Sequence, residues 1–128
     1  MRIILIDDEW NSLDLLEKMV RAVDAELQII GKFQNPLEAI PHILAGRPDV
    51  LLLDSEMPLL NGIDMIRMLA HTSCHFVIVT GGDASHWIEA YRLERTFQLH
   101  KPFSVNELRS VLSAISRLSK TTANNPDV

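Results

Sequence analysis

One pattern, four apolar residues followed by aspartate, occurs twice in the chain, in Ile3-Ile4-Leu5-Ile6-Asp7-Asp8 and in Val50-Leu51-Leu52-Leu53-Asp54. A short run that is apolar at every position is typical of a strand buried on both faces of a parallel sheet. A third run, Phe76-Val77-Ile78-Val79, repeats the pattern and ends in Thr80. Two less continuous runs, Leu27 to Phe33 and Phe97 to Leu99, complete five predicted strands.

Between and after these runs, the sequence predicts five helices. Apolar residues recur at helical spacing over roughly 10–23, and Asn35-Pro36 is typical of a helix start. That second helix should end near Gly46, because Pro48 follows. The remaining helices are expected after Gly62, after Asp83 and from the capping box Ser104-Val105-Asn106-Glu107.

Regular alternation of strand and helix predicts an α/β fold built from right-handed βαβ units. We expect a (βα)5 flavodoxin-like, doubly wound parallel sheet with strand order 2-1-3-4-5. In that order the carboxyl ends of strands 1 and 3 border a crevice, where ligands bind in such sheets. Residues 1–117 should form the domain. Residues 118–128 are polar and are predicted to be a tail or the start of a linker to an absent effector domain.

Composition excludes several classes of protein. The chain has 128 residues, a net charge of −5 and an apolar fraction of 47%. Such a charge argues against direct nucleic-acid binding, which needs clustered Lys and Arg. We expect no membrane span, because no apolar run is long enough. The single Cys74 cannot form an internal disulfide, and the first residues do not form a signal peptide, so we expect a cytoplasmic protein.

Reactive side chains follow four of the five predicted strands. Asp7 and Asp8 follow strand 1, Asp54 follows strand 3, Thr80 follows strand 4 and Lys101 follows strand 5. Each of these residues alone is ordinary in a turn or loop. All of them should meet at one edge of the sheet, which predicts a functional site there. Strand 2 is expected to contribute nothing to it.

Three carboxylates in one crevice repel one another and therefore need raised pKa values or a cation. Oxygen ligands without His or Cys favour Mg²⁺, which leaves coordination positions for phosphate oxygens. An ammonium and a hydroxyl group nearby suit the remaining oxygens of a transferring phosphoryl group. The carboxylate that receives this group would become an aspartyl phosphate.

Together, Asp7-Asp8-Glu9, Asp54 with Met57-Pro58, Asn61-Gly62, Thr80-Gly81 and Lys101-Pro102-Phe103 resemble the motifs of the response regulator receiver domain of two-component systems. The resemblance covers Met1 to about Arg117. It implies that Asp54 is the phosphoacceptor and that Asp7, Asp8, Asp54 and the backbone carbonyl of Glu56 hold Mg²⁺. It further implies that Thr80 and Lys101 bind phosphoryl oxygens and that Gly81 leaves the site open, and the Lys101-Pro102 bond is often cis in the family.

By the same resemblance, the chain should take its phosphoryl group from a histidine kinase or phosphotransfer protein. It would signal through the face formed by helix 4, strand 5 and helix 5, with a fused or separate effector domain, and we favour a transcriptional output. The resemblance also allows a phosphorylation-dependent homodimer. Such a domain catalyses only its own phosphorylation and dephosphorylation and is not an enzyme in the usual sense.

Gln98 departs from the family pattern, which has an aromatic residue at this switch position, coupled to Thr80. We therefore expect phosphate to be accepted but the region of helix 4 to rearrange atypically. Trp10 is either a partly exposed aromatic residue at a helix start or a contact for the phosphodonor. Trp87 either packs on its own domain or anchors a partner, because Trp is enriched in binding hot spots.

Three other classes of protein share part of this pattern. A haloacid-dehalogenase-type phosphatase needs Asp-x-Asp after strand 1, where this chain has Asp7-Asp8-Glu9-Trp10. A flavin carrier needs a hydroxyl- and Gly-rich loop at the same place. A degenerate receiver that acts as a phosphorylation-independent interaction module is the remaining alternative, and the five intact site residues count against it.

Overall fold

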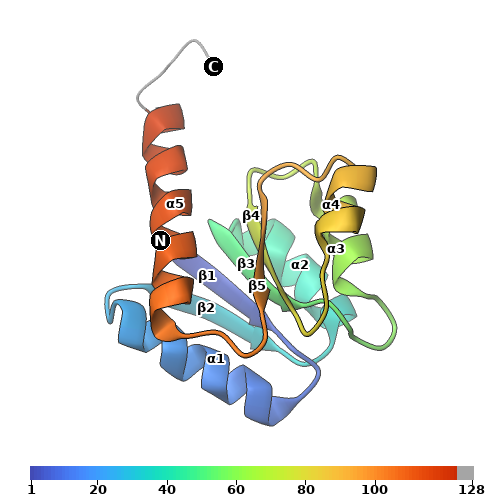
Figure 1. The fold of residues 1–128 in the computed structure, drawn as a ribbon, viewed down its shortest axis with the longest axis horizontal. Helices are drawn as coiled ribbons and strands as arrows, with labels where there is room; N and C mark the ends of the chain where they lie inside the picture. Colours follow the sequence, from blue (N-terminus) through green and yellow to red (C-terminus); the bar gives the residue numbers. More distant parts are fainter. Residues whose placement is uncertain (124–128) are drawn as a thin grey trace.

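The computed structural model describes residues 1–123 of the chain, with side chains placed through residue 119. Within this range five parallel strands alternate with five helices, and the sheet order is β2-β1-β3-β4-β5 (Figure 1). The predicted flavodoxin-like fold and strand order are confirmed. In chain order the elements are β1 (Arg2–Ile6), α1 (Trp10–Val23), β2 (Gln28–Phe33), α2 (Pro36–Gly46), β3 (Val50–Asp54), α3 (Gly62–Leu69), β4 (His75–Thr80), α4 (Ser85–Ala90), β5 (Thr96–His100) and α5 (Val105–Ala123).

Two apolar layers enclose the sheet. Because side chains alternate along a strand, Ile3 and Leu5 pack with α1 and α5, while Ile4 and Ile6 face the opposite layer. Figure 1 shows α1 and α5 on one side of the sheet and α2, α3 and α4 on the other. Burial on both faces explains why β1, β3 and β4 are apolar at nearly every position.

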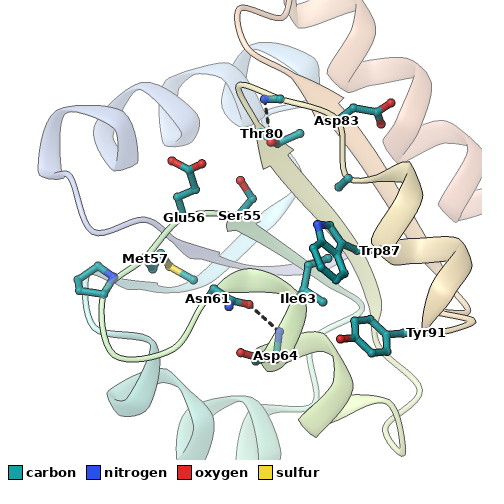
Figure 2. Close-up of a pocket in the computed structure, with 13 residues that line it drawn as sticks. Ser55, Glu56, Met57, Asn61, Ile63, Asp64, Thr80, Asp83, Trp87 and Tyr91 are labelled. Carbon is teal, nitrogen blue, oxygen red and sulfur yellow. Dashed lines mark hydrogen bonds between the residues drawn. The ribbon is translucent and has the colours of Figure 1, made fainter.

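Helix starts follow the local sequence. The side chain of Asn35 accepts a hydrogen bond from the N–H of Leu37 at 2.9 Å and caps α2. Asn61 caps α3 in the same way, accepting from the N–H of Asp64 at 2.9 Å (Figure 2). At α5 the predicted capping box is present: Ser104 Oγ accepts from the N–H of Glu107, and Glu107 accepts from the N–H of Ser104.

Helix α5 extends past the predicted domain boundary at residue 117. Helix α5 continues to Ala123, so residues 118–123 are helical, and residues 124–128 lie outside the described part of the chain. The residues beyond Leu118 are mostly polar in sequence and carry no apolar periodicity, which is why the sequence pattern did not extend the helix. None of the helices within residues 1–123 combines the length and the apolar character that a bilayer-spanning segment needs.

Candidate functional site

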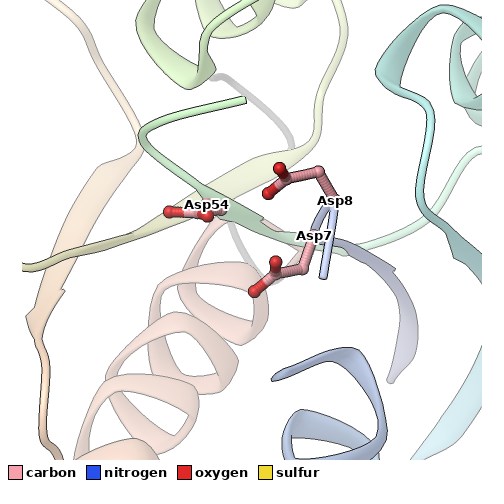
Figure 3. A group of neighbouring side chains, drawn as sticks. All are labelled: Asp7, Asp8 and Asp54. Atoms are coloured by element: carbon pink, nitrogen blue, oxygen red, sulfur yellow. The ribbon is translucent and has the colours of Figure 1, made fainter. Parts of the chain in front are cut away.

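Asp7, Asp8 and Asp54 converge at the carboxyl edge of the sheet. Strands β1 and β3 are neighbours, with Ile6 paired to Leu53, so the acids that end them lie side by side. One oxygen from each of the three carboxylates lies within 4.8 Å of the others. Figure 3 shows Asp7 and Asp8 projecting from the end of β1 beside Asp54 from β3. Asp7 and Asp54 are buried, whereas Asp8 is half-buried.

Asp7 is held in an environment that disfavours its charge. Its Oδ1 accepts a hydrogen bond from the N–H of Glu9 at 3.0 Å, but its Oδ2 is buried without a partner. Burial raises the pKa of Asp7, and the nearby charges of Asp54 and Asp8 act in the same direction. An orphaned carboxylate oxygen among two further carboxylates suits a hard cation, and the oxygen-only donor set suits Mg²⁺.

Lys101 brings a positive charge to Asp54. Its Nζ lies 3.4 Å from Asp54 Oδ1, the same oxygen that accepts a bond from the N–H of Glu56 at 3.3 Å. The backbone N–H of Lys101 donates to the carbonyl of Thr80 at 2.8 Å, which ties the end of β5 to β4. The Lys101-Pro102 bond is cis, as it often is in the family that the sequence resembles. Because the Lys101 side chain is 41% exposed, the ion pair itself adds little stability.

Thr80 is the last residue of β4 and is buried. Its Oγ1 accepts a hydrogen bond from the N–H of Gly82 at 3.0 Å (Figure 2). A Cβ at Gly81 would meet no atom within 4 Å, so this position is open, as expected. The structure therefore places Thr80, Asp54 and Lys101 at the ends of three adjacent strands, β4, β3 and β5.

Gly62, the first residue of α3, lies close to the backbone at the end of β3. A Cβ on Gly62 would lie 2.7 Å from the carbonyl oxygen of Asp54 and 3.1 Å from the Cα of Ser55. The N–H of Gly62 also donates to the carbonyl of Ser55 at 3.1 Å. The start of α3 thus packs against the backbone of Asp54, and a side chain at position 62 would push the two apart.

Gln98 forms a cluster of hydrogen bonds with the start of α4. Its Oε1 accepts from the N–H of Ala84 at 2.9 Å, and its Nε2 donates to Asp83 Oδ1 at 3.2 Å and to Ser85 Oγ. Helix α4 has no side-chain cap from its own N-cap residue, Ala84. Hydrogen bonds from Ser85 and Gln98 lower the pKa of Asp83 to about 2. The side chain of Gln98 therefore links β5 to the start of α4 through hydrogen bonds.

One residue near the acids was not predicted to take part, and a second, Trp10, was predicted to be either an exposed aromatic residue or a contact for the phosphodonor. Gln34, directly after β2, donates from Nε2 to the carbonyl of Asp8 at 3.3 Å, so the expectation that strand 2 contributes nothing was wrong. Residues that follow neighbouring strands reach the same edge, and this rule could have identified Gln34. Trp10 is exposed, with the Lys32 ammonium 5.0 Å from its ring centroid.

A family model for the response regulator receiver domain matches residues 3–113. The chain therefore belongs to the response regulator receiver domain family. An uncharacterized response regulatory protein of Yersinia pestis is 34% identical over 118 residues, which are 91% of this chain and 49% of that protein. The transcriptional regulatory protein BtsR of Salmonella typhimurium is 28% identical over 112 residues, covering 88% of this chain and 46% of BtsR.

Among solved structures, the response regulatory domain of protein mrkE from Klebsiella pneumoniae superposes with a TM-score of 0.81 at 21% identity. The match covers 94% of this chain and 99% of that structure, and it supports the fold. In contrast, the chain spans about half the length of the curated relatives that it matches, 49% and 46% in the two cases above.

Proposed function

We propose that this receiver domain accepts a phosphoryl group on Asp54 in a reaction assisted by Mg²⁺. One observation supports this assignment above the others. Asp54 is the carboxylate that lies both in the acidic group with Asp7 and Asp8 and within 3.4 Å of the Lys101 ammonium. A nucleophile that is to receive a polyanionic group needs positive charge on both sides of the transferred oxygens.

Asp7, Asp8, Asp54 and the backbone carbonyl of Glu56 would hold the metal ion. The unpartnered, buried Oδ2 of Asp7 and the three clustered carboxylates fit this role. When bound, Mg²⁺ neutralises the negative charge of the carboxylates and of the phosphoryl oxygens. Glu56 also donates its N–H to Asp54 Oδ1 at 3.3 Å, which helps to orient the acceptor carboxylate.

In the transfer, an oxygen of the Asp54 carboxylate attacks the phosphorus of a phosphohistidine. The P–O bond forms as the P–N bond breaks, and the histidine of the donor leaves and is protonated by solvent. The Lys101 ammonium and the Thr80 hydroxyl donate hydrogen bonds to the phosphoryl oxygens. Attack of water on phosphorus later restores the carboxylate and releases inorganic phosphate. The domain thus catalyses only its own modification.

Thr80 Oγ1 accepts from the N–H of Gly82, two residues before Ala84, which Gln98 holds. Engagement of Thr80 with a phosphoryl group would compete with this bond and alter the segment that leads into α4. We propose that the signal passes through α4, β5 and α5, with Gln98 and Thr80 as switch residues. Amide exchange with and without a beryllofluoride mimic tests this; the aromatic-switch response of other receivers across residues 80–101 would contradict it.

A histidine kinase or a phosphotransfer protein is the proposed donor. Relatives about twice as long that include a transcriptional regulatory protein support a transcriptional output, through a fused or separate effector domain. A phosphorylation-dependent homodimer is compatible with the same face. With a net charge of −5, the domain itself is not proposed to bind nucleic acid.

Incubation with acetyl phosphate and Mg²⁺, followed by intact-mass measurement, tests the proposal. We expect wild-type protein to gain one phosphoryl group and Asp54→Ala to gain none. Asp14→Asn is a matched control, because Asp14 is a surface acid paired with Lys18 on α1. Absence of phosphoryl addition to the wild type, or addition to Asp54→Ala, would contradict the proposal and favour a phosphorylation-independent interaction module.

A further inference from the structure

A crevice of about 680 Å³ separates α4 from α3 and from the loop after β3. Figure 2 shows Trp87 and Tyr91 projecting into it from the α4 side, opposite Ile63 and Asp64 of α3. Helix α4 has no fully buried residue, and Trp87 and Tyr91 are 47% and 41% exposed. Two large aromatic side chains therefore face an open crevice instead of a packed core.

The Tyr91 ring, which stacks on Trp87, already contacts a cation. The rings of Trp87 and Tyr91 stack with centroids 5.9 Å apart and an interplanar angle of 13°. The guanidinium carbon of Arg67, on α3, lies 4.1 Å from the Tyr91 ring centroid. This is the geometry in which an aromatic face attracts a guanidinium group, and Trp is the strongest such partner. The Trp87 ring offers the same chemistry beside it.

The charge of the crevice is negative. Glu56, Asp64 and Asp83 line it, and none of its lining residues within the described part of the chain is Lys or Arg. Arg67 lies at its margin, 3.8 Å from Asp64, and offsets part of this charge. Asp83 keeps its charge at any physiological pH, because hydrogen bonds from Ser85 and Gln98 lower its pKa to about 2. Polyanions such as nucleic acid or an acidic membrane surface are disfavoured here.

We infer that the crevice between α3 and α4 is a docking site for a basic segment of a partner protein. An Arg or Lys side chain of the partner lies against the Trp87 ring, and Asp64 and Glu56 face its charge. Apolar residues of the same segment contact Met57 and Ile63, which also line the crevice. Aromatic side chains beside carboxylates provide both affinity and charge selectivity for such a partner.

This inference does not rest on the proposed phosphoryl transfer, because docking is measured on the unphosphorylated domain. The two are linked in space: Thr80, Ser55 and Glu56 line the crevice and also adjoin Asp54. Loss of phosphorylation in Asp54→Ala and loss of docking in a crevice variant are therefore separate results, each read with its own assay.

The test is a ¹H–¹⁵N chemical-shift titration of the full chain with the peptide acetyl-Gly-Arg-Leu-Arg-Gly-amide. We expect saturable shifts concentrated in residues 55–64 and 82–91. A peptide with citrulline in place of both arginines has nearly the same shape without the charge, and it should bind at least about tenfold more weakly. Trp87→Leu and Asp64→Asn should each weaken binding about three- to tenfold.

Two variants serve as matched controls and should leave the affinity unchanged. Trp10→Leu removes the other exposed tryptophan, which lies on α1, and Glu89→Gln removes a charge from α4 outside the crevice lining. Equal binding of the arginine and citrulline peptides would overturn the inference. So would unchanged affinity in both Trp87→Leu and Asp64→Asn, or shifts concentrated at Asp7, Asp8 and Asp54 in place of the crevice.

Discussion

Asp7 shows how a single side chain combines a structural cost with a proposed function. One of its oxygens is bonded to the N–H of Glu9, and the other is buried without a partner. Desolvation, together with the charges of Asp54 and Asp8, raises its pKa. An acid whose pKa is raised on folding opposes folding at every pH above its unfolded pKa, because its ionised form is less stable in the folded state.

Replacing Asp7 by Asn should therefore stabilise the metal-free protein at neutral pH, because the amide carries no charge that burial and the neighbouring acids disfavour. The gain should decline as the pH falls through the folded pKa of Asp7 and vanish below its unfolded pKa, where the side chain is protonated in both states. Urea unfolding with a chelator present, at neutral and at acidic pH, measures both differences. Asp8→Asn should gain less, since Asp8 is only half-buried.

The same substitution should weaken Mg²⁺ binding, because it removes one of the proposed carboxylate ligands. The account would be contradicted if Asp7→Asn were less stable than wild type at neutral pH without divalent cations. Unchanged Mg²⁺ affinity in a titration followed by tryptophan fluorescence would contradict the ligand role.

Between elements, the approach of α3 to the end of β3 depends on Gly62. A Cβ there would lie 2.7 Å from the backbone oxygen of Asp54, so Gly62→Ala must displace either α3 or Asp54. We expect it to lower the free energy of unfolding by about 1–3 kcal/mol. At Gly81 the added Cβ would meet no atom within 4 Å, so Gly81→Ala should change it by less than about 0.5 kcal/mol. Equal effects of the two substitutions in urea unfolding would contradict this packing argument.

The attachment of α4 to β5 depends on Gln98. Without its side-chain oxygen, the N–H of Ala84 loses its partner, and the loss of one helix cap amounts to about 1 kcal/mol. Gln98→Leu should therefore speed amide exchange at Ala84 about fivefold. Gln34→Leu, which removes the side-chain bond to the carbonyl of Asp8, should leave exchange at Ala84 unchanged. Unchanged exchange at Ala84 in Gln98→Leu would show that this residue does not hold the helix.

Over the whole molecule, α5 is anchored by Leu108, Leu112 and Ile115, all buried. A chain that ends after Arg117 keeps these contacts and should lose less than about 1 kcal/mol of unfolding free energy. A chain that ends after Ser110 loses Leu112 and Ile115 and should be destabilised by more than about 4 kcal/mol. Urea unfolding compares them, and the predicted domain boundary at 117 would be wrong if both were equally unstable.

The sheet was predictable from sequence because its central strands lie between two helix layers and are apolar at nearly every position. The acids that end β1 and β3 were predictable as neighbours because alternation of strand and helix predicts a parallel sheet, and the flavodoxin-like order common for five strands places strands 1 and 3 side by side. The continuation of α5 was missed, since polar residues beyond Leu118 carry no periodic signal. The bond from Ala84 to Gln98 joins residues 14 apart through a loop conformation that local patterns do not encode. The crevice between α3 and α4 likewise depends on the distance between the two helices, which local sequence patterns do not encode.

The central claim is that Asp54 carries the phosphoryl group, and reduction with borohydride tests it most directly. An acyl phosphate is reduced to an alcohol, which converts a phosphorylated Asp into homoserine and leaves free carboxylates unchanged. After incubation with acetyl phosphate and Mg²⁺, reduction, digestion and peptide sequencing by mass spectrometry, we expect homoserine at position 54 alone. Homoserine at position 7 or 8, or its absence at position 54, would contradict the account.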